Sequence, residues 1–228
     1  MQLYNEDSYK YFKTLQEQGV KVDHIITDPP YNISQDNNFT TMGRAGLDFG
    51  EWDRGEFDLL SWITMYSQLL NKNGSMIIFC SARDISDICR TLESADMVVK
   101  DVLIWQKTNP MPRNATRRYV QDTEFYIWAV KKKAKWIFNK PDDVPYLRTV
   151  YQTSLTSGSE RLGHPTQKKL ELMEYIVSIH TNEGQTILDP FMGVGSTGQA
   201  CLNLGRDFIG IEREQQYYDK AKERLLHE

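Results

Sequence analysis

The chain has 228 residues, of which 40% are hydrophobic and 25% are charged, and its formal net charge at pH 7 is −4. This is the composition of an ordinary folded domain, and it excludes a disordered chain and a protein that is basic throughout. The sequence starts without a secretory signal and has no apolar run of membrane-spanning length, so we expect a cytoplasmic protein. Its three cysteines lack CxxC spacing and its four histidines lack HxxxH spacing, so we expect no metal site.

Apolar runs typical of buried strands alternate along the chain with helical patterns. In chain order the sequence predicts a helix over 6–18, a strand over 23–27, a helix over 57–71, a strand over 75–80, a helix over 84–95, strands over 99–106 and 124–130, a helix over 166–180, a strand over 185–189, a helix over 197–204, a strand over 207–212 and a helix over 214–226. This alternation is typical of a single α/β domain with a mainly parallel sheet. Residues 32–56 and 131–163 show neither pattern, and irregular segments of that length are uncommon unless they cover or bind a ligand.

The most informative short motif, Asp28-Pro29-Pro30-Tyr31, directly follows the first buried strand. Its two prolines fix φ and remove two backbone donors, which leaves a stiff corner with free carbonyl acceptors. The carboxylate and a proline carbonyl can each accept an N–H of an amino group on a flat ring, while Tyr31 stacks on that ring. The alternative is an ordinary turn in which the aspartate starts the turn and the tyrosine packs.

A second motif, residues 186–198, combines a strand, a Gly-rich turn and the start of a helix. Gly193, Gly195 and Gly198 fit GxGxxG, in which glycine permits a tight turn and the close approach of a ligand to a helix N-terminus. The turn also fits GxxxxG, but Gln199 stands where a phosphate-binding loop requires lysine. A nucleoside triphosphatase is therefore disfavoured.

The strand after this turn ends at Glu212, where an acid can accept hydrogen bonds from two ribose hydroxyls. A surface carboxylate at a strand end is the alternative. A dehydrogenase would normally have its glycine motif near the N-terminus and continue into a substrate domain. Here the ring-binding corner comes first and the glycine motif last, which indicates a different class of enzyme.

Basic residues are concentrated between Trp105 and Lys140, a stretch that contains nine Lys or Arg residues and two acidic residues. Asparagine, tyrosine and tryptophan are interleaved with them, a mixture suited to phosphate and base contacts. The candidates for nucleic-acid contact are Arg113, Arg117, Arg118, Lys131, Lys132 and Lys133. The alternative is an ordinary solvated surface.

DPPY at 28–31 and DPFMGVGST at 189–197 together closely resemble the motifs of amino-group DNA methyltransferases that use S-adenosylmethionine. The order of catalytic motif, variable region and cofactor motif is similar to that of their beta class, of the bacterial or phage restriction-modification type. HPTQK at 164–168 resembles a further element of that family, and the resemblance covers nearly the whole chain. It implies a Rossmann-like methyltransferase fold, with helices on both faces of a mainly parallel sheet and a permuted motif order.

The resemblance also implies roles for single residues. Asp28, Pro29, Pro30 and Tyr31 would hold the target base, and the cofactor would be bound by Asp7, His164, Lys168, Asp189, Phe191, Gly193, Gly195, Ser196, Thr197 and Glu212. Within this set, His164 and Lys168 would meet the methionine carboxylate, and Asp7 the adenine amino group of the cofactor. A loop histidine and a helix cap are the respective alternatives for His164 and Asp7. Residues 32–56 would form a lid, and residues from about 107 to 163 a variable DNA-recognition region.

The implied reaction is methyl transfer to N6 of an adenine that is flipped out of duplex DNA, by orientation and charge stabilisation without a covalent enzyme intermediate. Cys80 is therefore not assigned as a nucleophile. The expected partners are double-stranded DNA, a second copy of the chain and a cognate restriction enzyme. The alternatives are an N4-cytosine methyltransferase (a group in which serine is more frequent at position 28), an RNA or protein-amide methyltransferase, and a non-catalytic DNA-binding module.

Overall fold

The computed structural model describes residues 1–30, 57–112 and 115–226. Tyr31, Arg113 and the predicted lid over 32–56 therefore lie outside the described residues. The strands are β1 (Gln2–Tyr4), β2 (Val22–Thr27), β3 (Leu70–Cys80), β4 (Met97–Lys107), β5 (Thr123–Lys131), β6 (Val150–Thr153), β7 (Thr186–Asp189) and β8 (Asp207–Ile211). The helices are α1 (Ser8–Glu17), α2 (Leu59–Tyr66), α3 (Ile85–Ser94), α4 (Leu170–His180), α5 (Ser196–Asn203) and α6 (Gln215–Leu226), with 3-10 turns η3 (Ser67–Leu69) and η4 (Gly158–Glu160).

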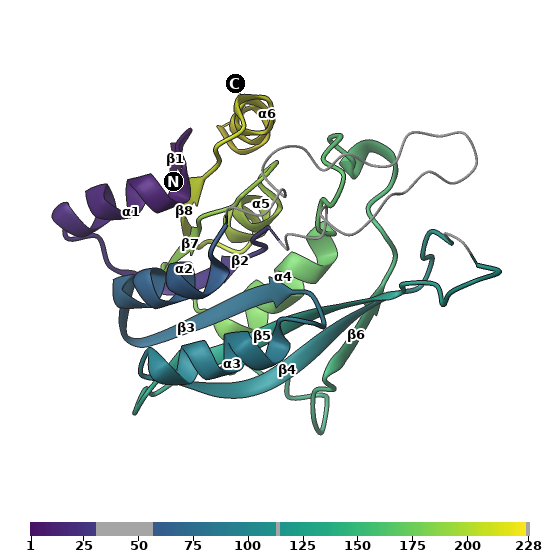
Figure 1. Cartoon of the computed structure of the whole chain (residues 1–228), viewed down its shortest axis with the longest axis horizontal. Coiled ribbons are helices and arrows are strands. Elements are labelled where there is room, and N and C mark those ends of the chain that lie inside the picture. Colours follow the sequence, from purple (N-terminus) through teal and green to yellow (C-terminus); the bar gives the residue numbers. More distant parts are fainter. Residues whose placement is uncertain (31–56, 113–114, 227–228) are drawn as a thin grey trace.

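The described strands form one eight-stranded sheet in the order β1-β8-β7-β2-β3-β5-β4-β6 (Figure 1). Neighbouring strands from β1 to β3 are parallel, and so are β4 and β6. Strand β5 is antiparallel to both of its neighbours, β3 and β4. The predicted mainly parallel α/β sheet is confirmed.

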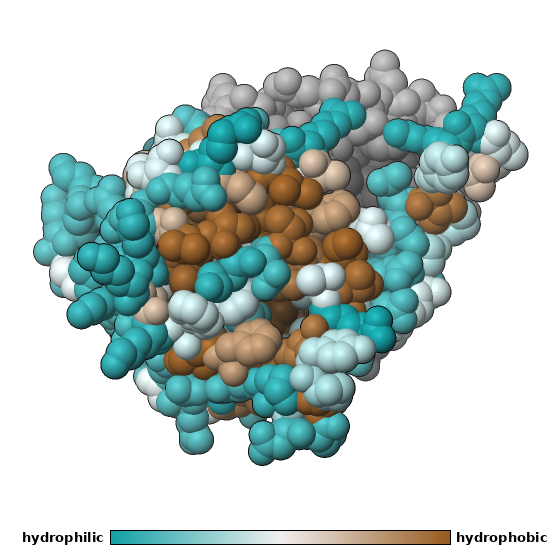
Figure 2. Space-filling view, turned by 90° about the horizontal axis from the view of Figure 1, so that it is seen from below, coloured by the Kyte–Doolittle hydropathy of each residue, from teal (hydrophilic) through white to brown (hydrophobic). Residues whose placement is uncertain are grey.

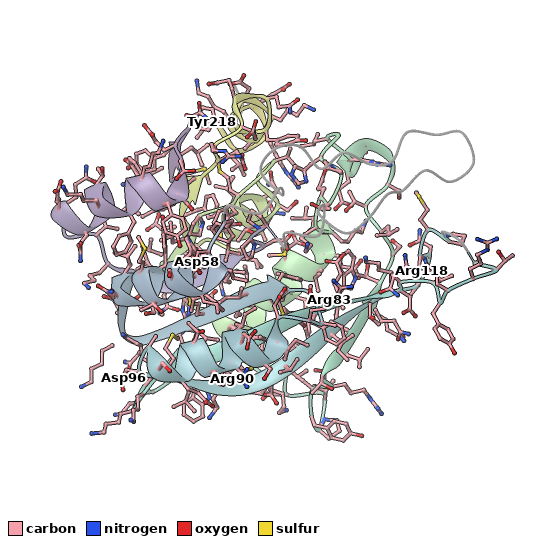
Figure 3. The ribbon with its side chains drawn as sticks, viewed as in Figure 1. Asp58, Arg83, Arg90, Asp96, Arg118 and Tyr218 are labelled. Carbon is pink, nitrogen blue, oxygen red and sulfur yellow. The ribbon has the colours of Figure 1, made fainter. Side chains whose placement is uncertain are left out.

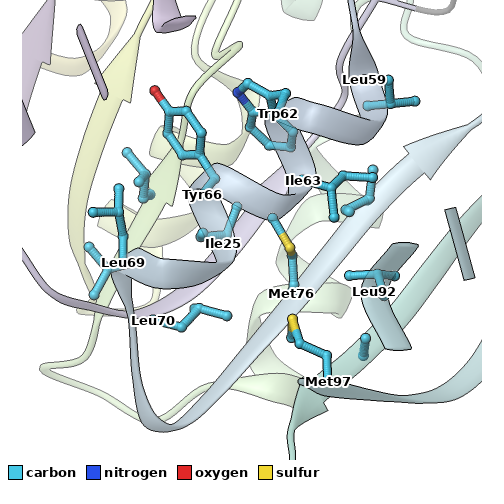
Figure 4. Close-up of a cluster of buried hydrophobic side chains, with 14 of the residues drawn as sticks. Ile25, Leu59, Trp62, Ile63, Tyr66, Leu69, Leu70, Met76, Leu92 and Met97 are labelled. Atoms are coloured by element: carbon cyan, nitrogen blue, oxygen red, sulfur yellow. The ribbon is translucent and has the colours of Figure 1, made fainter. Parts of the chain in front are cut away.

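Helices cover both faces of the sheet, and each face has its own buried core. Helices α1, α2 and α3 supply one core, in which Trp62 and Tyr66 of α2 lie over Ile25 and Met76 of the sheet (Figure 4). Helices α4, α5 and α6 supply the other. Successive side chains of a strand point to opposite faces, and Ile25 and Ile26 accordingly belong to different cores. This explains why the consecutive residues Ile25 and Ile26 are both apolar instead of alternating with a polar residue.

The helix predicted over 57–71 is shorter than expected. Helix α2 ends at Tyr66, and after the η3 turn Leu70 already belongs to β3, where it pairs with the buried Val22. The apolar residues that suggested further helical turns are buried by strand pairing instead. Short apolar runs do not distinguish these two outcomes.

Two strands were absent from the sequence prediction. Strand β1 has three residues, too few for a periodic pattern, and it is held by pairing with β8. Strand β6 lies within 131–163, for which no regular structure was expected, and it pairs with β4 from Ile104 to Lys107. Both strands are at the edges of the sheet. Strand β6 consists largely of strand-favouring residues (Val-Tyr-Gln-Thr), but a run of four residues inside a long irregular segment is too short to show a pattern.

Strand β2 lies between β3 and β7 and marks the point where the winding of the chain reverses. In open α/β sheets, ligands bind at such a switch point, outside the carboxyl ends of the strands. Asp28 directly follows β2, and Asp189 is the last residue of β7. The two sequence motifs therefore meet at this position.

Candidate active site

Hydrogen bonds to Asp189 join the two motif strands. Thr27 Oγ1 donates to Asp189 Oδ1 at 2.7 Å, and Thr197 Oγ1 donates to Asp189 Oδ2 at 2.6 Å. The Phe191 N–H also donates to Oδ1, at 3.1 Å. Burial raises the pKa of the Asp189 carboxyl to about 6, although these hydrogen bonds favour its ionised form. Asp189 thereby ties β2, β7 and α5 together.

A cavity of about 600 Å³ opens at the carboxyl edge of the sheet. This size is within the range of roughly 300–1,000 Å³ that is usual for small-molecule sites. The residues assigned from the sequence that line it are Asp7, Asp28, Pro29, Pro30, His164, Lys168, Asp189, Phe191, Gly193, Ser196, Thr197 and Glu212. Residues far apart in the sequence are thus brought to one cavity.

Gly195 is not among the residues that line this cavity. Its φ is +78°, and a Cβ added to it would lie 2.9 Å from Cδ1 of Leu225 in α6. Gly195 is therefore required by the positive φ of the turn and by the close packing of α6. A Cβ added to Gly193 would instead point at the His164 ring, 3.6 Å from Nε2. Of these two glycines, Gly193 is the one on the ligand side.

The Glu212 carboxylate is held by two backbone donors at the cavity wall. Gly193 N–H donates to Oε2 at 3.0 Å, and Glu214 N–H donates to Oε1 at 2.7 Å. Burial raises the pKa of the Glu212 carboxyl to about 7. Each carboxylate oxygen has two lone pairs, so the group can accept further hydrogen bonds from a diol in the cavity.

Asp7 serves as the N-cap of α1, since its Oδ1 accepts from the Lys10 N–H at 3.2 Å. The same residue lines the cavity, so the cap and the predicted ligand contact are compatible. Near it the wall is aromatic, because the rings of Phe57 and Phe191 meet edge to face with centroids 5.1 Å apart and Tyr9 packs on Phe57 at 5.9 Å. An aromatic wall beside a carboxylate suits a flat ring that bears an amino group. Phe57 and Tyr9 were not identified from the sequence, because neither belongs to a motif.

His164 is neutral at pH 7. Burial, with the cations Lys168 and Lys220 nearby, lowers the pKa of its imidazole to about 4. The Thr166 N–H donates to Nδ1 at 3.3 Å, which assigns the remaining proton to Nε2. His164 packs edge to face on the Tyr217 ring, 4.4 Å between centroids, and both side chains line the cavity. It can therefore donate a hydrogen bond to a ligand.

The Lys168 ammonium forms ion pairs with the carboxylates of Asp28 and Glu124; its distance to Glu124 Oε2 is 3.0 Å. Lys168 is fixed through its backbone as well, because its carbonyl accepts a hydrogen bond from Ser196 Oγ at 3.0 Å. The sequence associated Lys168 with the cofactor, and the structure also brings it to the catalytic motif. Glu124 was not assigned as a site residue from the sequence, which predicted only a strand over 124–130 there.

Cys80 ends β3 close to the site, but burial raises the pKa of its thiol to about 12. A thiol that stays protonated at neutral pH is a poor nucleophile. Among the residues that the structure describes, no group of three or more His, Cys, Asp or Glu is placed to hold a metal ion. None of the described helices is both long enough and apolar enough to cross a bilayer.

The basic candidates divide between two ends of the sheet. Arg117 and Arg118 are exposed in the connection between β4 and β5, on the carboxyl side where the cavity opens. Residues 131–133 lie at the other end of β5, about 27 Å away for a nine-residue strand. There Lys132 pairs with Asp96 at 3.7 Å, and Asp96 and Arg118 lie far apart in Figure 3. Lys131, Lys132 and Lys133 are therefore not brought to the cavity.

The fold is that of a Rossmann-like enzyme. Its cavity suits a nucleoside and lies next to the carboxylate of Asp28, which is followed by two prolines. Carboxylates exceed cations among the residues that line the cavity, so a cationic ligand is favoured there. Glu212 suits a ribose diol, the aromatic wall with Asp7 suits an aminopurine, and the neutral His164 suits a carboxylate. The residues present therefore fit S-adenosylmethionine.

Comparison with known proteins agrees with this class. The sequence profile of a family described as DNA methylase matches residues 22–223. The chain is 34% identical to the type II methyltransferase M2.DpnII of Streptococcus pneumoniae, over 99% of this chain and 89% of the relative. It is 32% identical to the type II methyltransferase M.HinfI of Haemophilus influenzae, over 96% and 66% of the two chains. The chain belongs to the DNA methylase family.

Solved structures give the same result. The crystal structure of an M1.HpyAVI–SAM complex is 52% identical, covers 98% of both chains and superposes with a TM-score of 0.82. The cytosine-N4-specific PvuII DNA methyltransferase is 15% identical over 98% of this chain and 85% of the other, with a TM-score of 0.73. This second likeness concerns the fold alone. The Rossmann-like methyltransferase fold expected from the sequence is confirmed.

Proposed function

We propose that this DNA methyltransferase transfers a methyl group from S-adenosylmethionine to the exocyclic N6 amine of adenine in duplex DNA. The observation that carries the proposal is the position of Asp28 and Pro29 at the wall of a cavity whose other groups fit the cofactor. S-adenosylmethionine is the methyl donor, in agreement with the M1.HpyAVI complex at 52% identity. A carboxylate at position 28 favours adenine, because serine is more frequent there in N4-cytosine enzymes.

In this arrangement, Glu212 accepts the ribose hydroxyls and the wall around Phe191 receives the purine. Asp7 accepts from the purine amino group, and the neutral His164 donates to the methionine carboxylate. Gly193 keeps the turn open on the ligand side. The bound cofactor supplies an electrophilic methyl group on a sulfonium.

Asp28 and the Pro29 carbonyl each accept one N–H of the target amine. These two hydrogen bonds direct the nitrogen lone pair towards the methyl carbon. An N–C bond then forms while the C–S bond breaks, and the C–S electron pair stays on sulfur. The amine nitrogen finally gives up one proton, and the Asp28 carboxylate, which already accepts a hydrogen bond from this amine, is proposed to take it. Tyr31 is proposed to stack on the target base, which must leave the duplex to reach the cavity.

We propose that residues from about 107 to 163 form the DNA-recognition region and that residues 32–56 cover the target base. The position of Arg117 and Arg118 on the cavity side of the sheet supports the first proposal. Arg113 belongs to the same connection in sequence and is proposed as a third contact. Lys131, Lys132 and Lys133 are left out of this surface because they lie at the far end of β5.

We further propose that the enzyme acts as a homodimer in the cytoplasm beside a cognate restriction enzyme. The type II methyltransferase relatives support the restriction partner. The face of the molecule seen in Figure 2 has a broad hydrophobic area bordered by hydrophilic residues, which supports the dimer. Light scattering across a range of protein concentrations tests the dimer directly, and a constant monomer mass would overturn it.

The first test is transfer of tritiated methyl from S-adenosylmethionine to unmodified duplex DNA, followed by nucleoside digestion and mass spectrometry. We expect the label in N6-methyladenine. Label in N4-methylcytosine would retain the mechanism and replace the base, since cytosine presents a similar exocyclic amine. Absence of label in DNA, with measurable cofactor binding, would overturn the proposal.

A further inference from the structure

A row of alternating charges runs along the carboxyl edge of the sheet. Lys107 Nζ lies 2.6 Å from Glu124 Oε1, and Lys168 Nζ lies 3.0 Å from Glu124 Oε2. Lys168 in turn pairs with Asp28. The row crosses four neighbouring strands, because Lys107 ends β4, Glu124 is in β5, Asp28 follows β2, and the Lys168 ammonium lies 4.9 Å from the centre of the Phe79 ring of β3.

The inner members of this row are shielded from water. The side chains of Lys168 and Glu124 are 6% and 23% exposed, and charges in such surroundings are stable only when they are paired. Burial lowers the pKa of Lys168, but the carboxylates of Asp28 and Glu124 outweigh it, and the net pKa is raised. Burial likewise raises the pKa of Glu124, and Lys168 and Lys107 reverse the shift. Each charge thus depends on its neighbours.

We propose that Glu124 is a positioning residue for methyl transfer, which holds Lys168 so that Lys168 fixes the Asp28 carboxylate for the target amine. The inference rests on the proposed function, because it assumes that Asp28 receives that amine. Lys107 is the outer end of the row, and the connection between β4 and β5, which carries Arg117 and Arg118, follows it directly. Glu124 therefore also connects this segment with the catalytic carboxylate.

The physical reason is the geometric demand on Asp28. A displacement of about 1 Å in a reacting arrangement can reduce the rate roughly 100-fold. Lys168 lies between two carboxylates, and neutralising Glu124 removes one of the attractions that set its position. The ammonium then moves with respect to Asp28, and the carboxylate moves with it. The cofactor contacts proposed at Glu212, Asp7 and the aromatic wall involve none of these groups and stay as they are. A shift of Lys168, which also lines the cavity, should therefore change cofactor affinity much less than it changes the rate.

The test compares Glu124→Gln with the wild-type protein in methyl transfer to long unmodified duplex DNA. We expect kcat to fall tenfold or more, while the Kd for S-adenosylmethionine stays within threefold. Asp23→Asn is the matched control, because Asp23 is a half-buried carboxylate in β2 that accepts hydrogen bonds from Asn71 Nδ2 at 2.9 Å and the Thr186 N–H at 3.0 Å, at the opposite end of the strand from Asp28. The control should show wild-type kcat per folded molecule.

Glu124→Asp separates a positioning role from a merely structural one. Glutamine has the better fit to the site and lacks the charge, whereas aspartate keeps the charge on a shorter arm. Positioning by charge predicts more activity in the Asp variant than in the Gln variant. Equal or lower activity of the Asp variant, or wild-type kcat in the Gln variant, would overturn the inference.

Lys107→Gln provides a second measurement should Glu124→Gln fail to fold, because Lys107 is at the outer end of the row. We expect a several-fold fall in kcat at unchanged cofactor affinity, and an unchanged kcat counts against the inference. Methyl transfer to DNA by the wild-type protein tests the proposed methyltransferase activity separately from the role of Glu124. For this purpose it does not matter whether adenine or cytosine receives the methyl group. Absence of wild-type transfer overturns both proposals, whereas transfer that is insensitive to Glu124 and Lys107 overturns only this one.

Discussion

Thr27 and Asp189, 162 positions apart in the sequence, share a hydrogen bond of 2.7 Å between the ends of β2 and β7. Thr27 immediately precedes Asp28, and Asp189 starts the turn that leads to Gly193. The bond therefore sets the distance between the catalytic motif and the cofactor motif. Both side chains are buried, so water does not readily replace the bond.

Thr27→Val should lower the free energy of unfolding by about 1–3 kcal/mol, because it leaves a buried carboxylate with one donor fewer. Valine has nearly the shape of threonine, so the loss reports the hydroxyl and not a cavity. Urea denaturation measures the effect. Thr64→Val, in the exposed part of α2, is the control and should change stability by less than about 0.5 kcal/mol. Equal effects of the two variants would contradict the role of the bond.

Asp28→Asn should reduce kcat by about 100-fold or more, because the amide accepts only weakly and no longer bears the charge that Lys168 pairs with. Cofactor affinity should stay within a few-fold, since the groups proposed to bind the cofactor are elsewhere in the cavity. Single-turnover methyl transfer and calorimetric titration measure the two quantities. Turnover close to that of the wild type would show that Asp28 is not the amine acceptor.

Glu212 should make cofactor affinity depend on pH around neutrality. The pKa of its carboxyl is about 7, and an ionised carboxylate accepts ribose hydrogen bonds better than a protonated one. The affinity of the wild-type protein should therefore increase as the pH rises from 6 to 8. In Glu212→Gln this contribution should be absent. The amino group of the cofactor also titrates, but it does so equally in both experiments and cancels when the two proteins are compared. Identical pH profiles would remove Glu212 from the binding site.

The same raised pKa has a consequence for stability in the absence of cofactor. Between the ordinary pKa of 4.5 and the folded value of about 7, the folded protein keeps a proton that the unfolded chain has lost. The free energy of unfolding from this group therefore falls as the pH rises through that window. Denaturation at pH 5 and pH 8 should show a smaller difference for Glu212→Gln than for the wild type. An unchanged difference would show that Glu212 is not buried.

Replacing Arg117 and Arg118 by alanine should weaken DNA binding. If each contacts one phosphate, the slope of log K against log salt becomes less steep by about 2, because each contact contributes about 0.9. Lys131→Ala with Lys132→Ala is the matched control, since it removes the same charge from the far end of β5. Fluorescence anisotropy at several salt concentrations measures the slopes. A larger effect of the lysine pair would move the DNA surface to the opposite end of the sheet.

The sequence by itself determined the local features of this protein. Asp28-Pro29-Pro30 and the Gly193–Gly195 turn depend on backbone restrictions that belong to the residues themselves, and they were recognised from the residues alone. The positions of most helices and strands were confirmed for the same reason, since hydrophobic periodicity is a property of neighbouring residues.

Tertiary structure decided the relationships between distant residues. Lys168 meets both Asp28 and Glu124 only because β2, β3 and β5 are neighbours, and the antiparallel direction of β5 sends Lys131 to the far end of the sheet. Gly195 faces α6 instead of the cavity because of how that helix packs. Strand order, strand direction and the direction of a side chain follow from pairing across the whole chain, and no local pattern of residues encodes them.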